Sequence, residues 1–197
     1  MWQRIACVFF VLLSVNIHRG QAQTTRVFQV NDAKKEVFPD LNRYLEVYED
    51  TTNRLNFKHI AAEHFQKNFI PHAKSPQKYN HKYAYWGKIT LQNNISFKDD
   101  WILHVGGRNS VVEVYIPQKD GKLMVQKTGV LVPVSEKSIN EAIISLVALH
   151  LPYQTPQTVY LKITVSDRRA PKFDLELFDL QSYNDELRWE SLFQGLF

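Results

Sequence analysis

The sequence of 197 residues has a single cysteine, Cys7. It lies in an N-terminal apolar stretch that we interpret as a signal peptide, so the mature chain is expected to contain no thiol and no disulfide. About 175 residues are enough for one hydrophobic core, and without disulfides that core must hold the fold by itself. The shortage of cysteine therefore favours a bacterial envelope protein over a small secreted module of animal origin.

Long runs of basic residues are missing as well, since no cluster of Lys and Arg exceeds two residues. The formal net charge is +4, and it falls to +2 once Arg4 and Arg19 leave with the signal peptide. A charge balance this close to zero gives no support for nucleic acid as a partner.

Motifs of the common enzyme classes are also absent from the mature chain. It contains no Gly-x-Ser-x-Gly elbow, no phosphate-binding glycine loop and no cysteine nucleophile. His59, Glu63 and His64 suggest a metal site at first sight, but the two histidines diverge by about 140° on a helix and match no zinc-protease pattern. We therefore expect no enzyme, no metal and no cofactor.

One set of carboxylates leaves an enzymatic alternative open. The acids that stand near turns or on predicted strands are Asp99, Asp100, Glu113 and Asp120. Solvated surface is the default interpretation of such acids, but a glycosidase pair is defined by distance in space, which a single sequence does not give. A glycan-active enzyme therefore remains the third hypothesis for this chain.

The N-terminal apolar run, from Ile5 to Val15, is too short to cross a bilayer. It has about a dozen residues, whereas a membrane helix needs roughly 20. It follows a short positive leader and precedes Gly20-Gln21-Ala22, a small-x-small site of the kind that signal peptidases cut. We predict a cleaved signal peptide over residues 1–22 and export to the periplasm or to the extracellular face of the cytoplasmic membrane.

The sequence is rich in aromatic residues, at 13%, and in segments where apolar residues recur at every second position. The clearest such segment starts at Tyr83 and predicts a β-strand. One face of this strand would carry Tyr85, Gly87, Ile89 and Leu91, and the other face Trp86, Lys88, Thr90 and Gln92. Further strands are expected over 27–30, 44–48, 101–105, 111–116, 123–127, 142–149, 159–165 and 173–177.

This regular spacing of strands and turns predicts a mainly β fold, either an antiparallel sandwich or a barrel. A single sandwich over residues 25–180, with one short helix at 56–67 in its N-terminal part, is the most economical interpretation. Beyond it, apolar residues become denser from Asp185 to Phe197. We therefore expect a chain that is cut off within a juxtamembrane segment, residues 181–197.

The stretch 84–93, Ala-Tyr-Trp-Gly-Lys-Ile-Thr-Leu-Gln-Asn, resembles the Tyr-Trp-x-Arg-aromatic-x-Leu-x-Asn strand of one family. The chain is similar to the second type of extracellular domain of bacterial seven-transmembrane receptors with diverse intracellular signalling modules, the DISM receptors. Other stretches that agree in order are 45–50, 101–103, 114–117, 127–129 and 159–162. The resemblance covers about residues 25 to 180, and the stretch 190–197 is similar to the sequence that leads into the family's first membrane helix.

The resemblance implies a jelly-roll sandwich like that of carbohydrate-binding modules, which would sense a small polar ligand outside the cell, with sugars as one candidate class. It also implies attachment to the membrane through a C-terminal region that this chain lacks. At two positions the family's usual arginine is a lysine here, Lys88 and Lys137. Lysine lacks the planar, two-pronged grip of arginine on a carboxylate or diol.

Five residues are candidates for ligand contact. Trp86 and Lys88 share one face of their predicted strand, where an aromatic plane beside a cation is suited to a sugar or an anion. Trp101 is an aromatic candidate of the same kind, Arg108 lies on a glycine turn, and Tyr115 belongs to one of the matching stretches. Each has a plainer alternative, because tryptophan is more often a core residue and a turn arginine is more often solvated.

The leading hypothesis is thus a sensory domain of a bacterial membrane receptor that binds a small polar ligand. The second is an interaction module that binds another envelope protein through a sheet face and has no small ligand. Both hypotheses depend on which faces of the predicted sheets are accessible, and sequence alone does not give this.

Overall fold

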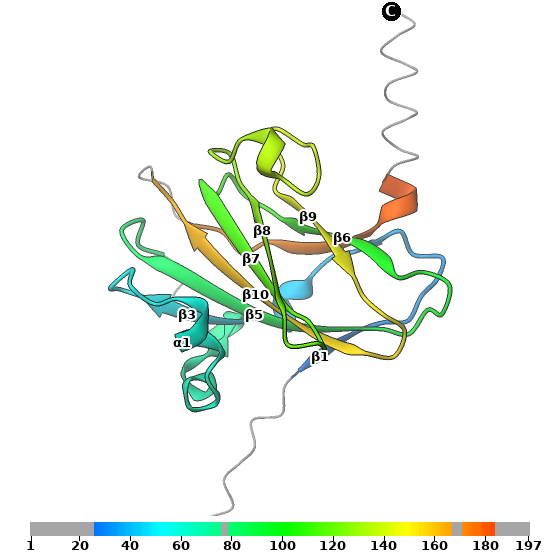
Figure 1. Ribbon diagram of the computed structural model, residues 1–197, viewed down its shortest axis with the longest axis horizontal. Coiled ribbons are helices and arrows are strands. Elements are labelled where there is room, and N and C mark those ends of the chain that lie inside the picture. Colours follow the sequence, from blue (N-terminus) through cyan, green and yellow to red (C-terminus); the bar gives the residue numbers. More distant parts are fainter. Residues whose placement is uncertain (1–25, 76–78, 167–170, 184–197) are drawn as a thin grey trace, which may run out of the picture.

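The computed structural model describes residues 26–75, 79–166 and 171–183, and these residues form two β-sheets that face each other (Figure 1). The larger sheet contains β1 (Val27–Val30), β3 (Glu46–Asp50), β4 (Ile70–Pro71), β5 (Ala84–Asn93), β7 (Val111–Pro117), β8 (Leu123–Thr128) and β10 (Pro156–Thr164). The smaller sheet contains β2 (Val37–Phe38), β6 (Asp100–Val105), β9 (Leu146–His150) and β11 (Leu175–Asp179). The helical segments are α1 (Phe57–Ala61) and the 3-10 helices η1 (Leu41–Arg43), η2 (Glu63–Asn68), η3 (His72–Lys74) and η4 (Val134–Glu136).

The order of strands in the larger sheet is β4-β3-β5-β10-β7-β8, and in the smaller sheet it is β2-β11-β6-β9. Nearly all neighbouring strands are antiparallel. The exception is β1, which runs parallel to the second half of β5, with Val27 beside Thr90. β3 pairs with the first half of β5, so β1 and β3 follow one another along the same edge of that strand.

The two sheets enclose the main hydrophobic core. It contains one face of β5, as the alternation predicted, because Tyr85, Ile89 and Leu91 all lie in this core. The other face of β5 belongs to a second cluster with Trp86. The mainly β sandwich expected from the sequence is therefore confirmed, and β5 is buried on both faces along nearly its whole length.

The second cluster lies on the outer face of the larger sheet, which α1 and η2 cover. Its buried members are Ile60 and Phe69 from the helical segment, Trp86 from β5 and Tyr160 from β10. We call residues 55–69 the cap. The cap turns a sheet face that would otherwise be solvated into a second packing layer.

The helix expected over 56–67 is interrupted in the cap. Ala62 has extended backbone, with φ −61° and ψ 136°, and separates α1 from η2. After η2, Phe69 is extended as well, with φ −73° and ψ 136°. With these two extended residues in the cap, Ile60 before the break and Phe69 after η2 both pack against the sheet.

The remaining differences lie at the ends of strands and in very short elements. Alternation placed β3, β9, β10 and β11 two to four residues away from their observed starts, and it missed the two-residue strands β2 and β4. The predicted signal peptide and the apolar tail lie outside the described residues. Within the described part of the chain, no helix combines the length and apolar character needed to cross a membrane.

Candidate functional site

The structure brings three of the five predicted ligand residues together on the outer face of the larger sheet. Trp86 and Tyr115 come from β5 and β7, and their ring centroids lie 5.5 Å apart. Lys88 follows two positions along β5. Above them, the cap residue Phe57 stacks on Tyr115 with ring centroids 5.1 Å apart and planes 8° from parallel. The cap therefore uses the aromatic surface that was predicted for a ligand.

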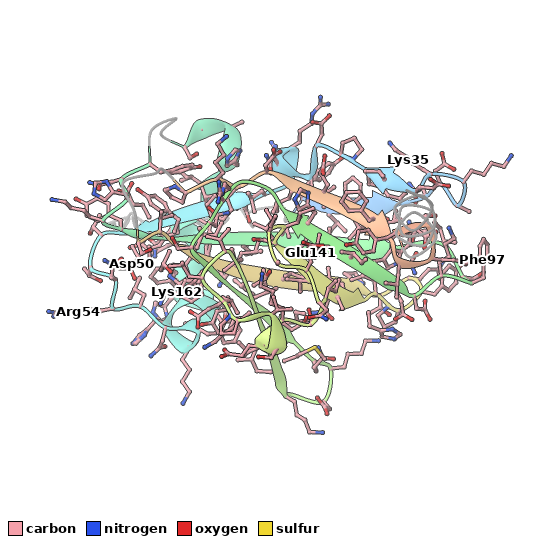
Figure 2. The ribbon with its side chains drawn as sticks, turned by 90° about the horizontal axis from the view of Figure 1, so that it is seen from above. Lys35, Asp50, Arg54, Phe97, Glu141 and Lys162 are labelled. Atoms are coloured by element: carbon pink, nitrogen blue, oxygen red, sulfur yellow. The ribbon has the colours of Figure 1, made fainter. Side chains whose placement is uncertain are left out.

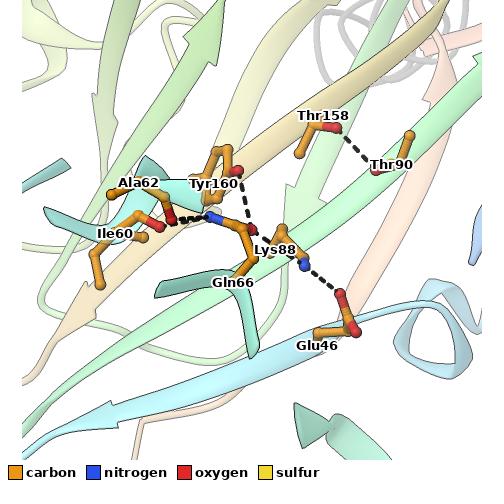
Figure 3. A network of polar contacts seen from close by, with 8 residues as sticks. All are labelled: Glu46, Ile60, Ala62, Gln66, Lys88, Thr90, Thr158 and Tyr160. Atoms are coloured by element: carbon orange, nitrogen blue, oxygen red, sulfur yellow. Dashed lines mark hydrogen bonds and ion pairs between the residues drawn. The ribbon is translucent and has the colours of Figure 1, made fainter. Parts of the chain in front are cut away.

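Lys88 is engaged in a buried polar network, drawn in Figure 3. Its Nζ lies 2.6 Å from Oε2 of Glu46 on β3, and it donates to Oε1 of Gln66 in η2 at 3.3 Å. The ammonium also lies 5.0 Å from the ring centroid of Phe69. With 7% of its surface exposed, Lys88 has its charge compensated by protein groups rather than by solvent.

Gln66 links this network to the cap. Its Nε2 donates to the carbonyl oxygen of Ile60 at 2.7 Å, near the end of α1. It also lies 3.4 Å from the carbonyl oxygen of Ala62, which already accepts from the Phe65 backbone N–H at 2.9 Å. Its Oε1 also accepts a long hydrogen bond of 3.5 Å from the hydroxyl of Tyr160. Gln66 thus ties the end of α1 to β5 and β10, and it fixes the cap on the sheet.

Trp101 and Arg108 lie elsewhere. Trp101 is in the core between the sheets, edge-on to Phe38 at a centroid distance of 5.9 Å, and Arg108 is exposed in the turn between β6 and β7. Trp86 and Trp101 are 0% and 1% exposed, so neither presents a surface on which a ligand could stack. Ligand contact by the five residues stays a prediction, and the structure offers accessible surface for it only at Arg108 and, in part, Tyr115.

Tyr115 shows how strongly the covered face is desolvated. Burial raises the pKa of its hydroxyl to about 12, and the nearby charge of Glu113 adds to the effect. The hydroxyl donates to Oε2 of Glu113 at 3.2 Å. Tyr115 therefore stays protonated at physiological pH and serves as a hydrogen-bond donor.

A pocket of about 240 Å³ lies at the edge of β3, next to the end of the cap. It is lined by Val47, Tyr48, Glu49, Asn68, Ile70, Ser75, Tyr79 and Tyr85. We call it the tyrosine pocket. Figure 2 shows Asp50, the last residue of β3, at the opposite end of the molecule from Phe97.

Strand pairing explains why a pocket forms at this place. β4 pairs with β3 only at Glu46 and Val47. Among the described residues, the same edge of β3 has no strand partner from Tyr48 to Asp50, because the chain diverges from it before Ile70. The space beside this edge is bordered instead by side chains from the segments before and after β4, namely Asn68, Ser75 and Tyr79.

The polar groups of the pocket converge on Glu49. Glu49 and Tyr85 are cross-strand partners on β3 and β5, so their side chains share a face. The backbone N–H of Asn80 donates to the Tyr85 hydroxyl oxygen at 2.6 Å. Burial raises the pKa of Tyr85 to about 12. The hydrogen bond from Asn80 opposes this shift, whereas the charge of Glu49 and a hydrogen bond with Glu49 increase it.

Tyr79 completes this arrangement. Its ring contacts the Tyr85 ring edge-on at a centroid distance of 4.7 Å, and its hydroxyl lies 2.9 Å from Oγ of Ser75. Burial raises the pKa of Tyr79, and the charge of Glu49 acts in the same direction. Glu49 therefore sits close to two tyrosine hydroxyls that both remain neutral at physiological pH.

Sequence reasoning did not predict the tyrosine pocket. Its residues come from β3, the end of η2, β4, the segment after η3, and β5, so no local pattern marks them as a group. The one available signal was Glu49, an acid in the family-like stretch 45–50. Alternation along the strand places Glu49 on the same face as the buried Val47.

The described residues contain no group of three or more His, Cys, Asp or Glu side chains that could hold a metal ion. His59 has a structural task instead. The Asn56 side chain accepts from the His59 backbone N–H, while His59 Nδ1 lies 3.5 Å from the Asn56 N–H, which together cap the start of α1.

The two facing sheets define a β-sandwich domain, and its sequence assigns it to a family of receptor domains. The family model described as 7TMR-DISM extracellular 2 matches residues 42–176, and the chain belongs to this family. It is therefore an extracellular domain of the kind found in seven-transmembrane receptors, which places it on the outer side of the membrane.

Comparison with individual proteins adds little to this assignment. No curated protein matches the chain. Among solved structures, the insecticidal crystal protein Cry2Aa matches with a TM-score of 0.31 and 14% identity, over 51% of this chain and 17% of that protein. The chain thus corresponds to about a sixth of that protein's length, and the likeness is too low to carry an argument.

Proposed function

We propose that this domain senses a small polar ligand outside the cell and that the ligand binds in the tyrosine pocket. The observation that carries the proposal is the pocket itself, which combines a carboxylate, tyrosine hydroxyls and apolar walls at a free strand edge. Concave sites with mostly apolar walls and a few convergent polar groups are the usual form of small-molecule sites. Sugars, which the family resemblance suggested, are one class of such ligands.

The tyrosine pocket is a better candidate than the sheet face predicted from the sequence. On that face, Trp86 has no exposed surface and Lys88 is paired with Glu46 at 2.6 Å. A ligand could reach these residues only if the cap moved and the contacts of Phe57, Gln66 and Phe69 were broken. The pocket, in contrast, is open without any rearrangement of the described residues.

The pocket is placed where ligand binding can influence the whole larger sheet. It touches β3, β4 and β5, and β5 pairs with β1, β3 and β10. A ligand shifts a conformational equilibrium only by the difference of its affinities for the two states. In the proposed mechanism, the occupied pocket favours one arrangement of the domain relative to the membrane segments of the receptor. No residue of the domain has a catalytic role in this proposal.

Thermal unfolding of the purified chain against a panel of sugars, organic acids and amines tests the proposal. A ligand of the pocket raises the melting temperature by mass action. The shift should disappear in Ile70→Trp, which fills the pocket from its 41% exposed rim, and should persist in Val37→Trp, a control of similar exposure (37%) on the smaller sheet. A panel without any shift, or a shift that Ile70→Trp leaves unchanged, contradicts the proposal.

A second candidate function, binding of another envelope protein, is favoured by the surface of β8. Leu123, Met124 and Val125 are exposed by 40%, 46% and 45%, although they stand consecutively on a strand at the edge of the larger sheet. Natural edge strands are usually protected by charge, proline or a covering segment, because an exposed apolar edge invites pairing with another chain.

Photocrosslinking in cells tests this second candidate. A photoreactive residue in place of Met124 should give a discrete crosslinked product, whereas the same residue in place of Phe97, which is 73% exposed at a loop, should not. Equal patterns at both positions would leave β8 without a specific partner and contradict this candidate.

A further inference from the structure

We infer that the ligand of the tyrosine pocket carries a positive charge, and specifically an ammonium group that pairs with Glu49. This inference rests on the proposed function, since it names the chemical class of ligand that the same pocket selects. Two observations support it: the difference in charge compensation among the three acids of β3, and the tyrosine side chains that line the pocket around Glu49.

The three acids of β3 differ in how their charges are compensated. Glu46 is paired with Lys88 at 2.6 Å. Asp50 accepts hydrogen bonds from the backbone N–H groups of Thr52 and Leu55 at 3.1 and 3.0 Å, and from the Thr52 hydroxyl. Both therefore receive the donors that a buried carboxylate needs.

Glu49 has no comparable partner. Among the residues that the structure describes, no basic side chain lies within ion-pair distance of Glu49, and the hydrogen-bond partner of its carboxylate is Tyr85. A carboxylate can accept up to about four hydrogen bonds, so most of the capacity of Glu49 remains unused. A half-buried carboxylate in this state is stabilised by any cation that enters the pocket.

The walls of the pocket also suit a cation. Tyr79 and Tyr85 line it on the same side of the sheet as Glu49. Tyr48 borders it from the opposite face of β3, where its ring packs on Phe65 and Phe69. The faces of aromatic rings carry negative potential, and they attract ammonium groups, most of all where water is partly excluded. The other lining side chains are neutral, and Asn68 and Ser75 supply oxygen atoms that can accept from a primary ammonium.

The same features disfavour other classes of ligand. An organic acid would bring a second negative charge next to Glu49, and none of the eight lining residues is basic. A neutral sugar could use the hydroxyls and the carboxylate, but it would leave the charge of Glu49 without compensation. The volume of about 240 Å³ is just below the roughly 300–1,000 Å³ of drug-sized sites, which points to a small amine.

Calorimetric titration of the purified chain tests this inference with four probes: choline, ethanolamine, glucosamine and glucose. Choline carries a quaternary ammonium group, ethanolamine a primary ammonium group, and glucosamine an ammonium group on a sugar ring. Glucose is the neutral counterpart of glucosamine. At least one of the three cations should bind, and glucose should bind about tenfold more weakly than glucosamine or not at all. Binding should weaken as salt is added.

Two variants give the inference a sharp control. Glu49→Gln keeps the size of the side chain and removes its charge, so cation affinity should fall by about tenfold or more. Ile70→Lys places a cation at the 41% exposed rim and should also weaken binding, whereas Val37→Lys, with the same charge change on the smaller sheet, should not. Because Ile70 is exposed, this second variant is informative even if Glu49→Gln fails to fold.

The outcomes separate the inference from the proposed function. Cation binding that both pocket variants weaken supports the two together. Binding of glucose alone overturns the inference but leaves a ligand-sensing pocket in place. Cation binding that Glu49→Gln and Ile70→Lys leave unchanged also overturns the inference. If neither these probes nor the wider panel of sugars and organic acids binds, the proposed function fails as well.

Discussion

At the scale of single residues, the decisive feature is how the two buried charges of Lys88 and Glu46 compensate each other. The sequence predicted Lys88 as a ligand contact, and the structure pairs it with Glu46 beneath the cap. A buried pair of this kind contributes little net stability compared with apolar residues of similar size, but the loss of one partner leaves a buried, uncompensated charge. Lys88 therefore matters to folding whether or not it contacts a ligand.

This difference can be measured with a mutant cycle. Lys88→Met should lower the free energy of unfolding by about 3–5 kcal/mol, because it removes the cation that lies 2.6 Å from the buried Glu46 carboxylate. The double variant Lys88→Met with Glu46→Leu should recover a large part of that loss. Urea unfolding of the three variants, including Glu46→Leu alone, gives the coupling energy. Strictly additive effects of the two single changes would contradict the pairing.

The pKa of Tyr85 makes a second prediction at this scale. Its folded pKa of about 12 lies above the ordinary value of 10.0, so folding favours the neutral hydroxyl. The resulting stability is fully present below pH 10 and is lost as the pH rises toward about 12. The free energy of unfolding should therefore fall over this interval, and it should fall less steeply in Tyr85→Phe.

Titration of tyrosinate absorbance in the folded chain checks this assignment. Tyr115 also has a pKa raised to about 12, so the folded chain should show more than one late-titrating tyrosine, and Tyr85→Phe should remove one of them. A late-titrating fraction that is the same in both proteins would show that Tyr85 ionises in its ordinary range.

At the scale of elements, β5 is the strand around which the larger sheet is built. Both of its faces are buried, one in the core between the sheets and the other beneath the cap. Gly87 stands on the inner face, where an added Cβ would lie 2.8 Å from the ring of Phe173 and 3.2 Å from Leu45. Glycine is needed here because of this close packing, and not because of its backbone angles.

Gly87→Ala should therefore destabilise the domain by about 1–3 kcal/mol through overpacking. Chemical unfolding measures the effect. Phe173→Leu in the same chain should relieve part of it, because the nearest atom to the added methyl group belongs to the Phe173 ring. If Gly87→Ala is as stable as the parent chain, the inner face of β5 is less tightly packed than the structure indicates.

At the scale of the whole molecule, protection is greatest in the middle of the larger sheet and least at its β8 edge. β5 and β10 each pair with strands on both sides. Among the described strands β8 pairs with β7, its other side forms a single isolated bridge between Lys127 and Lys137, and it exposes Leu123, Met124 and Val125. Segments with few buried contacts open at a lower free energy than the global unfolding of the domain. The cap lies between these extremes, since it packs on the sheet through one face only.

Native-state hydrogen exchange should reflect this order. Amides of β5 and β10 should exchange only by global unfolding, those of the cap at a lower free energy, and those of β8 fastest among the longer strands. Mass spectrometry of peptic fragments resolves these three regions. Equal protection of the cap and β5 would show that the cap is an inseparable part of the main core and does not open by itself.

The sequence by itself determined the sandwich. Alternation is a local property of a strand, since side chains two residues apart point to the same face, and it correctly assigned Tyr85, Ile89 and Leu91 to one side of β5 and Trp86 to the other. The order of several short motifs was enough to indicate the family. Neither conclusion required knowledge of which segments meet in space.

Only the tertiary structure decided which surfaces remain accessible. The cap shields Trp86 from solvent, because Ile60 before the break at Ala62 and Phe69 after η2 both pack on the same sheet face as Trp86. The sequence pattern predicted one continuous helix over 56–67 and did not predict this contact. The tyrosine pocket exists because β4 stops pairing after two residues and leaves the edge of β3 to side chains from distant segments. Accessibility depends on contacts between such segments, and these are set by the packing of the folded chain and not by any local pattern.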